Sequence, residues 1–528
     1  MIERPQRAQS SAAERSHSGA YPTSIRTMTE PTDTSRMPAS SASASAAAAD
    51  RHTELLVLGA GPGGYVAAIR AAQLGLQVTI VEEKYWGGVC LNVGCIPSKS
   101  LLKNAEVANI MLHHAAEFGV LADNISMDFG VAHARSRKVS ASIVKGVHYL
   151  MRKNKITEVN GRGTFRDAHT IEVATAEGPV TISFDKCIIA TGSHVAQLPG
   201  VEMGGPVVSF EEQILDPALP HSIVIVGAGA IGMEFAYVLA NYGVQVTIVE
   251  YLDRVLPNED KDVSKEIAKQ YQKLGITLRA GHKTTSVERT GDGVAVAIEP
   301  VVLPDGSLPA NGHVETIYAE RCLISTGFRP NVEGYGLENT GVELTERGAI
   351  AVDDSMQTSV PHIFAIGDVT AKLQLAHVAE AQGVVAAETI AGEETVPLGD
   401  YRMMPRATFC NPQVASFGLT EEQARAAAAN DPEMDVRVST FPFSANGKAQ
   451  GLAEAQGFVK IVADGRYGEL LGAHMVGPQV SELLPELVLA QKWELTTEEI
   501  ARTVHVHPTL AEALKESVEG VLGEMINL

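Results

Sequence analysis

The sequence predicts an α/β protein built on a strand–helix–strand unit that occurs twice. Residues 53–83 and 222–250 each contain an apolar strand, a turn with three glycines, a helical stretch and a second strand. The second strand ends at Glu82 in the first copy and at Glu250 in the second, and both copies end in the letters QVTIVE. The spaced glycines are Gly59, Gly61 and Gly64 in one copy and Gly227, Gly229 and Gly232 in the other.

Each element of this unit suits a bound dinucleotide. The first glycine allows a tight turn, the second lets the backbone approach a pyrophosphate, and the third lets the helix pack closely on the strand. The helix N-terminus then offers free N–H groups and a partial positive charge to the phosphates. A single glycine motif is weak evidence, but two copies between strand and helix indicate two Rossmann-like domains.

The acidic residue at the end of the second strand predicts the kind of nucleotide. A carboxylate there accepts hydrogen bonds from ribose hydroxyl groups and repels a 2′-phosphate. No arginine directly follows Glu250, and Arg254 is four residues away. The second unit is therefore expected to bind NAD and not NADP.

Composition limits the remaining possibilities. A chain of 528 residues is long enough for several domains. Its net charge of -21 argues against a nucleic-acid partner, which would require a basic surface. Uninterrupted apolar stretches are too short for a membrane span. Residues 1–50 are rich in Ser, Ala and Pro and are predicted to be a disordered tail. They lack the apolar middle of a secretory signal, and a transit peptide, although conceivable from the many Arg and Ser residues, is disfavoured by the acidic residues, so a cytoplasmic protein is expected.

Cys90 and Cys95 form the most informative chemical motif. Four residues separate them, and a predicted helix follows, with Pro97 in an early position. Cysteines at this spacing can reach disulfide geometry, and a helix N-terminus favours the thiolate. A structural bridge or a metal site is the alternative, but no second cysteine pair follows at zinc-finger spacing, and no metal is predicted. The pair is therefore predicted to be redox-active.

The segment GGVCLNVGCIPSK resembles the active-site signature of the flavin disulfide reductases that use a pyridine nucleotide, and most closely that of the dihydrolipoamide dehydrogenase branch. The resemblance extends from about residue 53 to the end of the chain. It implies FAD at the first unit and NAD at the second. It also implies that Cys95 lies against the flavin, that Cys90 meets the substrate, and that Lys99 lies beside the flavin.

Shorter motifs fit the same family in the same order along the chain. The resemblance implies that Asp368 contacts the ribityl chain of FAD and that Gly327 lies near the nicotinamide cofactor. The segment ATGS adds further expected FAD-binding residues, which are Thr191, Gly192 and Ser193.

The segment HPTLAE resembles the base motif of this family. It implies that His507 is the catalytic base and that Glu512 orients it. Histidine suits thiol chemistry because its ordinary pKa lies near neutral pH. In the family this histidine faces the cysteines of the other subunit, which implies a homodimer. The expected substrate is a dihydrolipoyl group on the acyltransferase (E2) of a 2-oxo acid dehydrogenase complex.

The same resemblance predicts the domain boundaries. Residues 51–200 form the first FAD segment with the cysteine pair, residues 201–322 the NAD-binding domain, and residues 323–396 the second FAD segment. Residues 397–528 form a C-terminal α+β dimerisation domain.

Related enzymes are the main alternatives. Glutathione reductase shares the cysteine loop but normally prefers NADPH, which Glu250 disfavours. Mercuric reductase has an extra C-terminal cysteine pair that GEMINL lacks, and a soluble transhydrogenase lacks the full redox pair. A flavoprotein that acts only as a scaffold would have no need for the thiols and the base together.

Overall fold

The computed structural model describes residues 51–303, 306–309 and 312–528, so the predicted N-terminal tail lies outside the described part. The first sheet has the strand order β3-β2-β1-β6-β5-β4, with β17 beside β6. The strands are β1 Arg51–Leu58, β2 Val78–Glu82, β3 Thr157–Asn160, β4 Arg162–Asp167, β5 Thr170–Thr175, β6 Gly178–Ile189 and β17 Ile363–Ala365. Strands β1, β2, β3, β6 and β17 pair in parallel, while β4 and β5 add an antiparallel extension.

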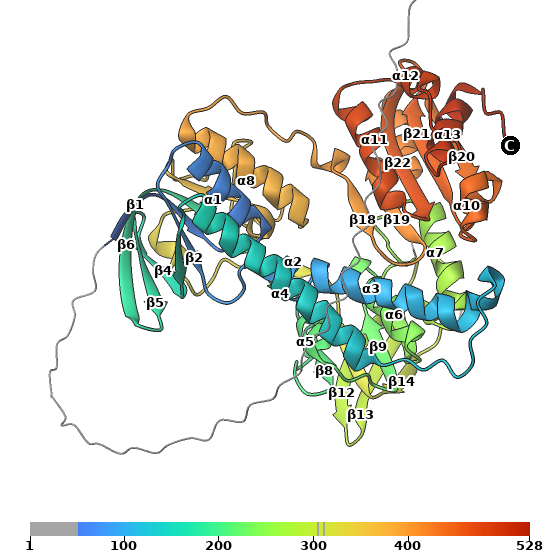
Figure 1. Cartoon of the computed structure of the whole chain (residues 1–528), viewed down its shortest axis with the longest axis horizontal. Helices are drawn as coiled ribbons and strands as arrows, with labels where there is room; N and C mark the ends of the chain where they lie inside the picture. Colours follow the sequence, from blue (N-terminus) through green and yellow to red (C-terminus); the bar gives the residue numbers. More distant parts are fainter. Residues whose placement is uncertain (1–50, 304–305, 310–311) are drawn as a thin grey trace, which may run out of the picture. The chain divides into compact units, whose positions relative to one another are not determined.

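Two helices distant in sequence pack side by side in this first domain, α1 (Pro62–Gln73) and α8 (Ala376–Ala391) (Figure 1). A Cβ at Gly63 would lie 2.9 Å from Ala379 O, and one at Gly383 would lie 2.7 Å from Gly63 O. Glycine thus permits the close approach of the two helices. Strand β17 and α8 therefore return the chain to the first sheet.

The second glycine unit lies in a second domain, which is built on a parallel sheet in the order β11-β10-β9-β15-β8. Its strands are β8 Val207–Val208, β9 Ser222–Val226, β10 Gln245–Glu250, β11 Thr277–Ala280 and β15 Arg321–Ile324, and its helices are α5 Phe210–Leu215, α6 Ala230–Asn241 and α7 Lys261–Lys273. The antiparallel strands β12 His282–Thr290, β13 Gly293–Pro300 and β14 Glu315–Ala319 form a separate ladder. The predicted boundary after residue 322 falls inside β15 and is corrected to the end of that strand, because Leu323 and Ile324 still pair with β9.

The C-terminal part is an antiparallel sheet in the order β18-β19-β22-β21-β20, packed against helices as predicted for an α+β domain (Figure 1). The strands are β18 Arg406–Thr408, β19 Gln413–Gly418, β20 Val436–Pro442, β21 Phe458–Asp464 and β22 Glu469–Gly477. The helices are α9 Glu421–Ala428, α10 Gly447–Gly451, α11 Val480–Lys492, α12 Thr497–Arg502 and α13 Glu512–Leu522. Their core contains Phe417, Phe441, Ile461, Leu487 and Leu514, which are almost fully buried.

The predicted helix after the cysteine pair is present. Helix α2 (Gly88–Asn92) carries Cys90, and α3 (Cys95–Asn109) begins at Cys95. The chain continues as η1 Ile110–His114, η2 Ala115–Phe118 and α4 Phe129–Lys153, whose N-terminus is capped by Asp128. The remaining short elements are β7 Ser193–Val195 paired with β16 Phe328–Pro330, and η3 Leu337–Asn339, η4 Gly367–Thr370, η5 Tyr401–Met403 and η6 Phe443–Ala445. Across the described residues, helices with the length and apolarity needed to cross a membrane are absent.

Candidate active site

The two glycine turns have the same backbone geometry. Gly59 has φ +104° and Gly227 has φ +105°, values that favour glycine. A Cβ at Gly64 would lie 2.0 Å from Gly59 O, and one at Gly232 would lie 2.1 Å from Gly227 O. The first and third glycines of both units are therefore required by the protein's own backbone.

The second glycine of each unit faces open space. A Cβ at Gly229 would meet no described heavy atom within 4 Å outside its chain neighbours, and one at Gly61 would meet only the Cα of Gly88, 3.9 Å away. This space in front of a helix N-terminus fits the pyrophosphate of a dinucleotide.

The terminal glutamates hold the two turns in place. Glu82 accepts a hydrogen bond from Ala60 N at 2.7 Å, and Glu250 accepts one from Ala228 N at 2.7 Å. The second oxygen of Glu250 accepts Leu252 N at 2.9 Å. A carboxylate has about four acceptor positions, so both glutamates keep capacity for a ribose hydroxyl.

One cavity of about 1360 Å³ brings together all of the predicted FAD-binding residues. Its lining includes Gly59, Gly61, Gly64, Glu82, Lys99, Thr191, Gly192, Ser193 and Asp368, together with Cys90 and Cys95. Its size and its contact with the first glycine turn fit FAD. The predicted NAD-binding residues Gly227, Gly229, Gly232, Glu250 and Gly327 lie at or just beyond the carboxyl ends of β9, β10 and β15, the edge at which parallel sheets bind nucleotides.

The polar floor of the cavity joins distant segments. Ser193 Oγ donates to Asp368 Oδ2 at 2.7 Å, and Thr191 Oγ1 donates to the carbonyl of Asn331 at 2.9 Å. Burial raises the pKa of Asp368, and the Ser193 hydroxyl opposes this shift. The segment that follows β6 is thereby fixed to the one that follows β17.

The thiols of Cys90 and Cys95 lie within hydrogen-bonding range of each other, and both are free in this structure. The Cys90 thiol acts as donor, which raises its own pKa and lowers the pKa of Cys95 to about 7. Burial opposes the shift at Cys95, while the charge of Lys99 adds to it. Cys95 is therefore the thiol that ionises near neutral pH. By contrast, Cys187, Cys322 and Cys410 are buried, and burial raises their thiol pKa values.

The ion pair between Lys99 and Glu234 was not predicted from the sequence. Lys99 Nζ lies 3.1 Å from both carboxylate oxygens of Glu234, and it lies 4.3 Å from the ring centre of Phe409. Glu234 is buried in α6 and also accepts Phe409 N at 3.0 Å. Because Lys99 and Glu234 are 135 positions apart, the sequence around either residue gives no local signal of the pair.

His507 and Glu512 lie within hydrogen-bonding distance of each other. His507 Nδ1 lies 2.8 Å from Glu512 Oε1, and Thr509 N donates to the other oxygen of Glu512 at 2.8 Å. Burial alone would raise the pKa of Glu512, but these hydrogen bonds lower it. The His507 side chain is 79% exposed, and His507 is outside the set of described residues that line the large cavity. Within one chain the structure does not bring this histidine to the thiols.

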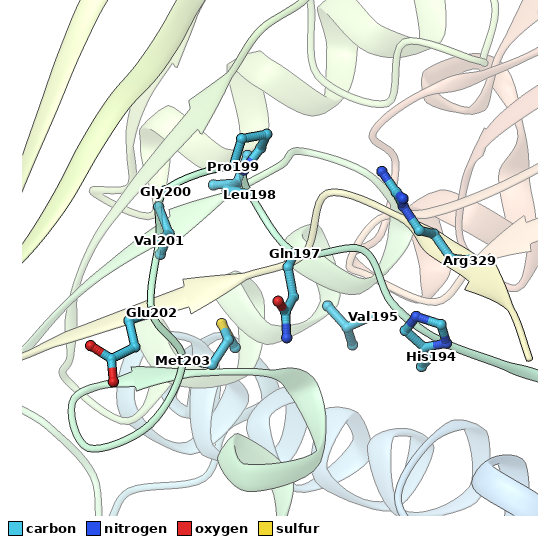
Figure 2. A pocket seen from close by; sticks show the side chains of 10 residues that line it. All are labelled: His194, Val195, Gln197, Leu198, Pro199, Gly200, Val201, Glu202, Met203 and Arg329. Atoms are coloured by element: carbon cyan, nitrogen blue, oxygen red, sulfur yellow. The ribbon is translucent and has the colours of Figure 1, made fainter. Parts of the chain in front are cut away.

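A second hollow, of about 830 Å³, lies beside the crossing strands β7 and β16 (Figure 2). Its lining consists of His194, Val195, residues 197–203 and Arg329, which pairs with His194 across the two strands. The residues predicted for catalysis or cofactor binding are absent from this lining. The candidate site is therefore assigned to the larger cavity.

Comparison with known proteins agrees with this geometry. Residues 53–383 match the pyridine nucleotide-disulphide oxidoreductase family, and residues 404–518 match the dimerisation domain of the same family. The chain belongs to this family. As a member of this family the chain uses FAD and NAD, and the match to the dimerisation domain supports a homodimer.

Several members of the family are similar over nearly their whole length. A dihydrolipoyl dehydrogenase of Corynebacterium glutamicum is 63% identical over 90% of this chain and 99% of its own. One from Mycobacterium tuberculosis is 59% identical with the same coverage. Among solved structures, LpdA from M. tuberculosis has a TM-score of 0.79 at 28% identity, covering 89% of this chain and 99% of its own. The flavoprotein disulfide reductase RclA from Escherichia coli, as a Cu(II) complex, has a TM-score of 0.78 at 25% identity, covering 89% and 100%.

Proposed function

We propose that the chain is a dihydrolipoyl dehydrogenase, which oxidises dihydrolipoyl groups and reduces NAD+. The observation that carries this is the Cys90–Cys95 thiol pair in one cavity with the first glycine turn and Lys99. Relatives 59% and 63% identical that bear this name support the choice of substrate.

The chemistry begins with the oxidised Cys90–Cys95 disulfide. A substrate thiol gives its proton to His507, and the resulting thiolate attacks the sulfur of Cys90. The S–S bond breaks, and Cys95 leaves as a thiolate, in keeping with its lowered pKa and with the charge of Lys99. The second substrate thiol then attacks the substrate sulfur that is bonded to Cys90, and its proton passes to the departing sulfur of Cys90. This step releases a cyclic lipoyl disulfide and leaves Cys90 as a thiol, Cys95 as a thiolate and His507 protonated.

FAD and NAD, when bound, supply the two-electron relay that restores the disulfide. The first glycine turn with Glu82, Thr191, Gly192, Ser193 and Asp368 would hold FAD, and Gly227, Gly229, Gly232, Glu250 and Gly327 would hold NAD. The carboxylate of Glu512 holds the His507 ring by its Nδ1 atom, so that Nε2 is left to accept the proton.

The base is proposed to act across the dimer. His507 is largely exposed and outside the cavity lining of its own chain, so His507 of the partner subunit would meet the thiols. Residues 397–528 would form the interface, and residues 51–200, 201–324 and 325–396 would form the first FAD segment, the NAD-binding domain and the second FAD segment. The proposed partner is the lipoyl-bearing acyltransferase of a 2-oxo acid dehydrogenase complex, and the proposed location is the cytoplasm, where thiols remain reduced.

A substrate comparison tests the proposal. The purified holoenzyme should reduce NAD+ with dihydrolipoamide and should lack glutathione reductase activity with NADH or NADPH. Cys90→Ser should abolish dihydrolipoamide turnover while FAD remains bound. Full dihydrolipoamide turnover in that variant, or glutathione reduction in the wild type, would contradict the proposal.

A further inference from the structure

Lys460 is a buried cation held between two parts of the chain. It lies on β21 in the C-terminal sheet, and its side chain is 1% exposed. Its Nζ atom lies 2.9 Å from Asp260 Oδ1, 2.6 Å from Asp262 Oδ2 and 2.7 Å from Glu421 Oε2. Three carboxylates outweigh the effect of burial and raise the pKa of Lys460, so the side chain is charged. Asp260 and Asp262 belong to the segment that starts α7, in the domain that contains the second glycine unit.

Asp260 is the centre of this cluster. Its side chain is fully buried, and it caps α7 by accepting Asp262 N at 3.0 Å. Its other oxygen accepts Glu421 N from the C-terminal part at 3.1 Å. Burial alone would raise the pKa of Asp260, but the hydrogen bonds from Lys460 and the backbone lower it. The residue is therefore an ionised carboxylate whose countercharge comes from another domain.

Hydrogen bonds connect the segment that ends at Asp260 with the second glycine turn. Leu256 N donates to Ala228 O at 2.9 Å, and Ala228 N donates to Glu250 at 2.7 Å. On the other side, Glu259 N donates to Leu256 O at 2.9 Å. Leu256 thus connects the turn between Gly227 and Gly229 with the cap of α7.

The backbone at Leu256 is strained. Its φ is +45°, in the left-handed region that a branched side chain disfavours, and the residue is 3% exposed. Such a conformation persists only when its surroundings enforce it. Glu250 fixes the segment at its start, and Asp260 with Lys460 fixes it at its end.

We propose that Lys460 is a positioning residue for NAD: through Asp260 it holds residues 251–260 against the second glycine turn. The inference rests on the proposed function only in taking NAD+ as the ligand of that turn. Lys460 acts through Asp260 and Leu256 and needs no contact with the nucleotide. The C-terminal domain would in this way set the affinity of a site built on another domain.

Lys460→Met in the holoenzyme is the direct test. Without the cation, the carboxylate of Asp260 is buried and unpaired, so the capped segment should move away from Ala228. We expect the KM for NAD+ to rise about threefold or more, with kcat and the KM for dihydrolipoamide changed less than about twofold. Calorimetric titration of the holoenzyme with NAD+ should show the same loss of affinity.

Asp262→Asn is the milder second variant. Asp262 is half-exposed and contacts Lys460 without capping α7, so this variant should fold and show a smaller rise in the KM for NAD+. It decides the question if Lys460→Met is insoluble. A KM for NAD+ that is unchanged in Asp262→Asn and in any soluble Lys460→Met would overturn the proposal.

Arg466→Gln is the matched control. Arg466 pairs with buried Asp464 at 2.5 Å and with Asp431 at 3.3 Å, and all three residues belong to the C-terminal domain. This variant should lower the melting temperature without raising the KM for NAD+. An equal rise in the control would also overturn the proposal, because general loosening would then explain the effect. A wild-type enzyme that fails to use NAD+ would instead refute the proposed function.

Discussion

Lys99 Nζ lies 3.1 Å from each carboxylate oxygen of Glu234, which joins the helix that starts at Cys95 to the helix behind the second glycine turn. The two charges have opposite effects on the buried thiol. Lys99 lowers the pKa of Cys95, and Glu234 raises it. The two charges of this pair therefore act against each other on the pKa of Cys95. Cys95 is the thiol that is expected to leave as a thiolate when the substrate opens the disulfide.

Substitutions of this pair should move the ionisation of Cys95 in opposite directions. Glu234→Gln removes a negative charge, lowers the thiol pKa and speeds alkylation of the reduced enzyme below neutral pH, by about threefold to tenfold. Lys99→Met should slow it by a similar factor, and the double variant should lie between the two. Alkylation rates against pH, with peptide mapping, measure this. Parallel shifts in both single variants would contradict the opposed roles.

Replacing Cys90 should show how strongly its hydrogen bond lowers the pKa of Cys95. Cys90→Ala removes the hydrogen bond that lowers the pKa of Cys95, so the midpoint of Cys95 alkylation should move above pH 7. Cys90→Ser keeps an O–H donor at the same position and should hold the midpoint closer to 7. Since a lower pKa means more thiolate at a given pH, the Ser variant should react faster at neutral pH. Identical midpoints would show that the hydrogen bond has no such effect.

The fold could be predicted largely from the sequence because its signals are local. The duplicated turn specifies strand, glycines, helix and acid within one short stretch, and both copies have matching φ values at Gly59 and Gly227. The helix after the thiols was also local, and α3 begins at Cys95. The second FAD segment, which contains β17, and the C-terminal domain could be predicted only from the family resemblance.

The ion pairs between domains could not be predicted, because their partners are far apart in the sequence. Lys99 and Glu234 are 135 positions apart, and Lys460 and Asp260 are 200 positions apart. Each pair joins helices or strands of different domains. Its geometry therefore depends on how the domains pack, which the hydrophobic periodicity of the sequence does not indicate. A lysine in the strand FVKIVAD looks like an ordinary solvated charge until the partner helix is in place.

Glu512 should matter only for the thiol step. Glu512→Gln weakens the hold on the His507 ring and should lower dihydrolipoamide oxidation by roughly a hundredfold, as His507→Gln should. NADH oxidation with an artificial acceptor should change little in either variant. Glu486→Gln is the matched control, because Glu486 lies 2.9 Å from the ring of His505 in a second histidine–glutamate pair. A comparable loss in the control would argue against a specific role of Glu512.

A site shared between subunits makes a complementation experiment possible. Cys90→Ser and His507→Gln should each be inactive as a homodimer. In a mixed dimer, one site combines the intact thiols of one chain with the intact histidine of the other. Random exchange of subunits should therefore restore about a quarter of wild-type activity, because half of the dimers carry one of two sites. Mixtures that stay inactive after verified exchange would place the base within its own chain.

The same substitution in the two glycine units should produce two different defects. Glu82 and Glu250 each hold the turn through one backbone N–H at 2.7 Å, Ala60 N in one unit and Ala228 N in the other. Glu82→Gln should reduce the FAD content of the purified protein, with a normal KM for NADH in the molecules that retain it. Glu250→Gln should leave the FAD content intact, raise the KM for NADH and narrow the preference over NADPH, because the charge that repels a 2′-phosphate is lost. Flavin absorbance per chain and paired NADH and NADPH kinetics separate the two outcomes. A loss of FAD in Glu250→Gln would reverse the assignment of the two units, and a wild-type preference for NADPH would contradict NAD as the ligand of the second unit.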